Sequence, residues 1–93
     1  MKKYQSIIIV NPNVDDEKLK KLENTITELI NKDGKLEKVE ELGKKKLAYE
    51  VQKNKEGIYI AFYFEANPTL IAELERHYRI IDEVIKFIDV KVD

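Results

Sequence analysis

The sequence predicts an α+β domain in which two helices cover one face of a four-stranded antiparallel sheet. Two segments carry apolar residues at helical spacing, and four segments are rich in β-branched and aromatic residues. Their order is β-α-β-β-α-β. Right-handed crossovers then place both helices on the same face of the sheet, which is the ferredoxin-like arrangement. The 93 residues suffice for one such domain, which we expect to span residues 1–93.

The first strand is expected from Tyr4 to Asn11, because this β-branched run is broken by Pro12. Asp15 or Asp16 can cap the helix that follows. The inner face of that helix is a set of apolar residues three and four positions apart: Leu19, Leu22, Ile26, Leu29 and Ile30. Gly34 is expected to end the helix with a positive φ.

A hairpin of two strands is expected next. Its first strand runs from Lys35 to about Val51, and the apolar pattern changes phase near Gly43, which predicts a β-bulge there. The residues from Lys53 to Gly57 are typical of a turn. The segment from Ile58 to Glu65 then forms the second strand of the hairpin.

A second helix and a fourth strand complete the order. Asn67 and Pro68 begin the helix, since proline is favoured at the first helical position. The inner face of this helix consists of four residues: Leu70, Ile71, Leu74 and Tyr78. The run from Val84 to Val92 is apolar and β-branched and predicts a strand. Asp89 interrupts that run, so the sequence does not assign its residues to one face of the sheet or the other.

Alternation along the first and third strands predicts two different sheet faces. The more apolar set is expected beneath the helices: Ile8, Val10, Ile58, Ile60, Phe62 and Phe64. The other set faces away from the helices and includes four large residues: Ile7, Ile9, Tyr59 and Tyr63. A sheet face in contact with water is usually more polar. We therefore interpret this open face as a surface for a protein or RNA partner, although such residues also suit strands in general.

The charge is balanced over the whole chain but not along it. Seventeen Lys and Arg residues and eighteen Asp and Glu residues give a net charge of −1. A domain that binds nucleic acid on its own is usually clearly basic. Residues 43–55 nevertheless carry five lysines and one glutamate. This indicates a local contact with an anionic surface rather than independent tight binding, although lysines also protect a hairpin edge from strand pairing.

The sequence gives no support for an enzyme. The chain has no cysteine and a single histidine, His77, which is expected beside the apolar stripe of the second helix. Its three glycines are isolated, so there is no glycine-rich phosphate loop. We therefore expect no metal and no cofactor. No apolar run approaches the roughly 20 residues that a bilayer crossing needs, so we expect a cytoplasmic protein with no membrane contact.

Three segments, in order, resemble the bacterial small-subunit ribosomal protein six family. They are Gly43–Tyr49 (GKKKLAY), the Lys55-x-Gly57-x-Tyr59 turn, and Leu74–Ile80 (LERHYRI) followed by Asp82, Val84 and Lys86. The resemblance covers the chain from Met1 to Val92. It implies a structural protein of the small ribosomal subunit that is monomeric when free. Such proteins bind the central domain of 16S ribosomal RNA together with the eighteenth small-subunit protein.

The resemblance also implies which residues bind RNA. Eight positions match the family's basic or aromatic positions: Lys2, Lys3, Tyr4, Lys44, Lys45, Lys46, Arg79 and Lys86. The central cluster is entirely lysine, which lacks the bidentate fork of arginine. Gln5 stands where an acidic residue is common in the family. Leu47 and Tyr49 are expected to serve packing.

One alternative comes from a different functional class. A ferredoxin-like domain can associate with itself through its open sheet face and bind a metabolite there. Such a site needs converging polar groups, and the open face supplies few: Gln5, Tyr59 and Tyr63. The third strand also lacks the pattern of an RNA recognition motif, so a free-standing RNA module is the weaker option.

Overall fold

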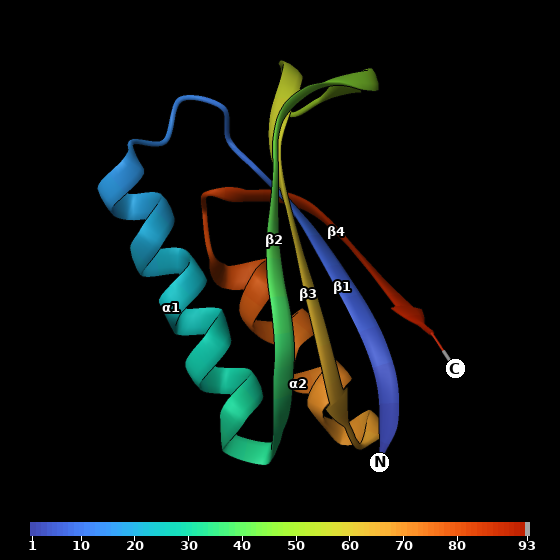
Figure 1. Ribbon diagram of the computed structural model, residues 1–93. Coiled ribbons are helices and arrows are strands. Elements are labelled where there is room, and N and C mark those ends of the chain that lie inside the picture. Colours follow the sequence, from blue (N-terminus) through green and yellow to red (C-terminus); the bar gives the residue numbers. More distant parts are fainter. Residues whose placement is uncertain (93) are drawn as a thin grey trace.

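Figure 1 shows the computed structural model, which describes residues 1–92; Asp93, the expected end of the domain, lies outside the described residues. The elements are β1 (Lys2–Val10), α1 (Asp16–Asp33), β2 (Gly34–Val51), β3 (Asn54–Ala66), α2 (Pro68–Ile80) and β4 (Val84–Lys91). All neighbouring strands are antiparallel, and their order in the sheet is β2-β3-β1-β4. Both helices lie on one side of the sheet (Figure 1). The predicted fold class is confirmed.

The core lies between the sheet and the two helices. The central strands contribute five side chains with no exposed surface: Ile8, Val10, Ile60, Phe62 and Phe64. The helices contribute Leu22, Ile26 and Ile30 from α1, and Leu70, Leu74 and Tyr78 from α2. The predicted helix-facing side of β1 and β3 is therefore confirmed. Ile58 lies at the edge of the core and is only partly buried.

α1 begins and ends where predicted, but the conformation of Gly34 at its end differs from the expectation. The Asp15 carboxylate accepts a hydrogen bond of 2.8 Å from the backbone N–H of Lys18, as an N-cap does. Gly34 does not supply a positive φ; its φ is −157°, and it is the first residue of β2. Close packing explains this glycine, because a Cβ there would lie 2.5 Å from the carbonyl oxygen of Glu65.

The hairpin differs from the expectation at its turn. The predicted bulge is confirmed, since the β2–β3 register shifts between Glu41 and Gly43 and the φ of Gly43 is +85°. The turn itself consists of Gln52 and Lys53, with φ values of 48° and 65°, as in a two-residue hairpin turn. The segment from Lys53 to Gly57 is therefore not the turn. Gly57 lies within β3, where a Cβ would overlap the Cγ2 atom of Ile9.

The register of β4 settles which of its residues face the helices. Lys86, Ile88 and Val90 lie opposite the open-face residues of β1, and directly paired residues share a face of the sheet. Phe87 and Asp89 therefore point toward the helices. The ring of Phe87 lies 5.2 Å from that of Tyr78 in α2.

The two glycines of β2 predict substitutions of different cost. Gly34→Ala should destabilise the protein by about 2–3 kcal/mol, because the new methyl group meets backbone that is packed tightly. Gly43→Ala should cost only about 1 kcal/mol, since open space surrounds it and the strain comes from its positive φ alone. Urea denaturation of both variants measures the difference. Equal costs would contradict this account of Gly34.

Candidate nucleic-acid interface

Three elements far apart in the sequence meet at one end of the sheet. The tip of the β2–β3 hairpin curls toward β4 (Figure 1). The Nζ of Lys86, in β4, donates a hydrogen bond of 2.9 Å to the Oη of Tyr49 near the hairpin tip. Gln52, Arg79 and Lys86 line a common hollow. Cations from the hairpin, the end of α2 and the start of β4 therefore share this end of the molecule.

The lysine cluster lies on the outer edge of this region. Lys44, Lys45 and Lys46 are exposed and pair in register with the first part of β3. The Nζ of Lys45 lies 5.9 Å from the centroid of the Tyr59 ring on the open face. Its two neighbours point to the opposite face by strand alternation. None of the three forms an ion pair with another residue between 1 and 92, so their charges are available to an anion.

Arg79 and Lys86 line the hollow that Gln52 of the hairpin turn also lines. The Arg79 guanidinium lies 5.7 Å from the centroid of the Phe87 ring and 3.9 Å from the Glu75 carboxylate, so its charge is partly engaged. The hydrogen bond from Lys86 to Tyr49 raises the pKa of the lysine and lowers the pKa of the tyrosine hydroxyl. Lys86 therefore stays a cation throughout the physiological pH range.

The predicted N-terminal RNA contacts lie elsewhere. Lys2, Lys3 and Tyr4 begin β1, at the end of the sheet away from the hairpin tip (Figure 1). The Lys3 ammonium lies 3.9 Å from the Glu65 carboxylate. Tyr4 packs against the core, with its ring 5.9 Å from that of Phe64. The structure thus separates this group from the lysine cluster, Arg79 and Lys86.

The exposure of Tyr49 differs from the expectation drawn from the sequence. Its side chain was expected to serve packing, but Tyr49 is 64% exposed. The cause is the loss of pairing between β2 and β3 in the segment between Lys46 and Val51. Residues 47–50 consequently bulge outward, and only Leu47 is half-buried. The sequence carries no local signal of this departure, because Leu47, Tyr49 and Val51 keep the alternation of a regular strand.

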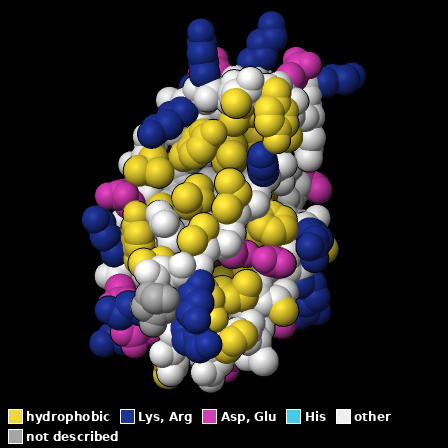
Figure 2. All heavy atoms as spheres, turned by 90° about the vertical axis from the view of Figure 1, so that its right-hand side faces the viewer, with side chains coloured by type: hydrophobic (Ala, Val, Ile, Leu, Met, Phe, Trp, Pro, Cys, Tyr) yellow, Lys and Arg dark blue, Asp and Glu magenta, His cyan; other side chains and the backbone are white. Residues whose placement is uncertain are grey.

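The open face of the sheet is largely apolar. Figure 2 views the side opposite α1 and shows a band of hydrophobic side chains, with Lys and Arg side chains at its margins. Ile7, Tyr59 and Tyr63 are half-buried there. Ile9 is only 3% exposed and so offers little surface. Two residues that the sequence left unassigned, Ile88 and Val90, are each 44% exposed on this face.

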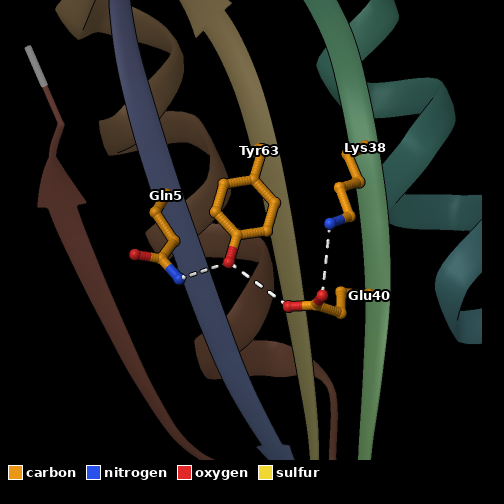
Figure 3. A network of polar contacts seen from close by, with 4 residues as sticks. All are labelled: Gln5, Lys38, Glu40 and Tyr63. Atoms are coloured by element: carbon orange, nitrogen blue, oxygen red, sulfur yellow. Dashed lines mark hydrogen bonds and ion pairs between the residues drawn. The ribbon is translucent and has the colours of Figure 1, made fainter.

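A polar network on this face joins side chains of β1, β3 and β2 (Figure 3). Gln5 Nε2 donates a hydrogen bond of 3.0 Å to Tyr63 Oη, and Tyr63 Oη donates one of 3.4 Å to Glu40. Lys38 lies 3.2 Å from the Glu40 carboxylate and 5.7 Å from the centroid of the Tyr63 ring. Tyr63 is therefore already engaged within the chain, which makes it a poorer stacking partner than Tyr49.

Two carboxyl groups, each beside a second carboxyl group, have raised pKa values. Burial and the neighbouring Glu41 raise the pKa of Glu23 to about 7. Burial and the neighbouring Glu75 raise the pKa of Asp89 to about 6. Each pair joins a helix to the sheet, and the Ser6 hydroxyl lies beside Asp89. Among residues 1–92, no three His, Asp or Glu side chains are placed to hold a metal ion, and no helix is long and apolar enough to cross a membrane.

Residues 3–91 match the family of ribosomal protein S6. The chain belongs to this family. It is 40% identical over 94 residues to the small ribosomal subunit protein bS6 of Helicobacter hepaticus, covering all of this chain and 69% of that protein. The corresponding protein of Koribacter versatilis is 43% identical over 91 residues, which cover 97% of this chain and 62% of the relative.

A solved structure agrees with this assignment. The crystal structure of 30S ribosomal protein S6 from Thermotoga maritima superimposes with a TM-score of 0.92 at 34% identity, covering 98% of this chain and 87% of the other. Family membership confirms the predicted resemblance. It makes the chain a ribosomal protein of the small subunit and not an enzyme, and it favours this hypothesis over a self-associating metabolite-binding domain.

The buried carboxyl group of Asp89 predicts a pH-dependent stability. Its folded-state pKa of about 6 lies above the usual 3.8, so the folded protein keeps a proton that the unfolded chain loses. Whereas Glu23 affects stability up to about pH 7, the contribution of Asp89 to stability should fall as the pH rises from about 4 to about 6 and then level off. Asp89→Asn should remove this fall and add about 1 kcal/mol at pH 7.5, after allowance for solvent screening.

Urea denaturation at pH 4 and pH 7.5 measures this effect. Glu28→Gln removes a carboxylate from an exposed site on α1 and controls for the loss of charge. An Asp89→Asn variant that is no more stable than the parent at pH 7.5 would contradict the prediction.

Proposed function

We propose that the chain binds the central domain of 16S ribosomal RNA, cooperatively with the eighteenth small-subunit ribosomal protein, during assembly of the small subunit. The observation that carries this proposal is the free lysine cluster of β2, joined at one end of the sheet by Lys86 and Arg79. Ammonium groups placed in this way contact phosphates and position a protein on RNA without reading its sequence.

The charge balance supports a cooperative mode of binding. The net charge is −1, and the group at Lys2 and Lys3 lies at the far end of β1. A contact limited to one end neutralises few phosphates, and affinity for RNA rises with the number of phosphates neutralised. Binding of the free monomer should therefore be weak, and a protein partner on the RNA would strengthen it.

The open face supports a protein contact. Ile88 and Val90 are exposed beside Ile7, in an apolar band with lysines at its margins. Contiguous apolar surface of this kind marks sites of protein association. The band reaches the basic hairpin through Tyr59, over whose ring Lys45 lies. A protein partner bound on this face would therefore lie close enough to contact the RNA that the hairpin binds, as cooperative binding requires.

Removal of the lysine cluster tests the RNA contact. Changing Lys44, Lys45 and Lys46 together to alanine should reduce the slope of log affinity against log salt by about 3. Filter retention on a central-domain fragment, with the eighteenth protein present, measures this slope. The matched control changes three exposed lysines of α1, Lys18, Lys21 and Lys32, to alanine, and should leave the slope unchanged. Absence of RNA retention with and without the partner would overturn the proposal.

A charge on the open face tests the protein contact. Ile88→Asp should abolish the strengthening by the eighteenth protein and leave the weak binding of the chain alone unchanged, because it places a carboxylate in the apolar band. Ile80→Asp is the matched control, since Ile80 is 71% exposed on α2, away from this face. Full partner enhancement in the Ile88→Asp variant would show that the partner binds another surface.

A further inference from the structure

We propose that Tyr49 is a stacking platform for an unpaired RNA nucleotide, with phosphate contacts from Lys46 and Lys55. This inference rests on the proposed function and deepens it, because it names the kind of RNA element that the hairpin recognises. It assigns a binding role to a residue that was expected to serve packing.

The Tyr49 ring is accessible on its faces. The side chain is 64% exposed. The Lys86 ammonium lies 2.9 Å from Oη but 5.1 Å from the ring centroid. These two distances place the ammonium at the hydroxyl end and not over the centre of the ring. The lysine therefore holds the ring by its hydroxyl end and leaves at least one face of the ring open.

This hydrogen bond orients the ring before any ligand arrives. An exposed tyrosine on a bulged segment would otherwise lose side-chain freedom on binding, which lowers affinity. Lys86 belongs to β4 and Tyr49 to the end of β2, so the contact also fixes the curled hairpin against the body of the sheet. The platform is thus preorganised by a residue that itself carries a positive charge.

A groove of about 500 Å³ lies beside the ring, on the hairpin itself. Leu47 and Ala48 provide apolar surface there, and Lys46 and Lys55 provide cations. Glu50 and Glu56 also line the groove, and Glu56 pairs in register with Lys46. The volume is within the range of small-molecule sites. An aromatic face beside cations is the combination that binds a base together with its phosphates.

An unpaired nucleotide fits this site better than a duplex does. Bases in a helix are stacked on one another and hide their faces, whereas those of loops and bulges can be splayed out onto aromatic rings. Phosphates of either form satisfy the lysines. The free tyrosine face therefore selects single-stranded RNA, with little preference among bases because every base has a π face.

Fluorescence gives a direct test, since the chain contains no tryptophan. Tyr49→Trp keeps an aromatic platform and introduces a single reporter at the site. At low salt, an unstructured oligouridylate should quench this fluorescence to saturation. A duplex RNA with the same number of phosphates should quench it several-fold less at equal concentration. Equal quenching by the two probes would overturn the assignment of an unpaired nucleotide.

Affinity measurements separate stacking from charge. On the central-domain fragment with the eighteenth protein, Tyr49→Leu should weaken binding roughly tenfold, as loss of one stacked base does. It should leave the salt slope unchanged, whereas Lys46→Ala should reduce the slope by about 1. Tyr49→Phe keeps the ring but loses the hydrogen bond to Lys86, so it should weaken binding less than Tyr49→Leu does. The thermal midpoint of each variant verifies that it is folded.

The outcomes distinguish this inference from the proposed function. Parent-like binding by Tyr49→Leu, together with loss of binding in the triple lysine variant, would overturn the stacking platform and leave the RNA-binding function intact. Failure of the parent chain to bind RNA with the partner present would overturn both. A tenfold loss in Tyr49→Leu at constant salt slope, with a smaller loss in Tyr49→Phe, would support the platform.

Discussion

The burial of one face of β1 and β3 beneath two helices is the constraint on which the rest of the structure depends. These central strands pair over nine residues, with Ile8 opposite Ile60 and Ser6 opposite Phe62. Burying side chains of this size contributes about 1.5–3 kcal/mol each. Because side chains alternate along a strand, this burial also decides what stands on the other face. A shift of one residue would move Ile7 into the core and Ile8 into water.

The sheet separates two kinds of surface. The open face is apolar and includes exposed side chains of β4. The hairpin end is basic because it carries the lysine cluster, and there β2 and β3 extend beyond the core. That extension is possible because antiparallel strands satisfy their backbone groups through pairing with one another, without a helix above them. The bulges in β2 then bend the free part of the hairpin toward β4. The contact between Tyr49 and Lys86 holds it there.

Much of the fold followed from local patterns. The helical spacing of Leu22, Ile26 and Ile30 and the cap at Asp15 identify α1 without further information. The wrong assignments came where one residue type serves two purposes. Gly34 follows the last residue of α1 but lacks the expected positive φ, and Gly57 lies in a strand rather than in a turn. In fact each leaves room for a neighbouring strand or side chain, and such a neighbour is invisible in a single segment.

The candidate site likewise depends partly on local sequence and partly on tertiary structure. The sequence by itself determined the order of elements, the apolar faces of the central strands and the local excess of lysine, because these are properties of neighbouring residues. Only the tertiary structure decided that Lys86 and Arg79 join the hairpin while Lys2 and Lys3 do not, because that depends on which ends of distant strands meet. It also decided the exposure of Tyr49, since a four-residue departure from strand pairing is set by the partner strand and not by the residues that bulge.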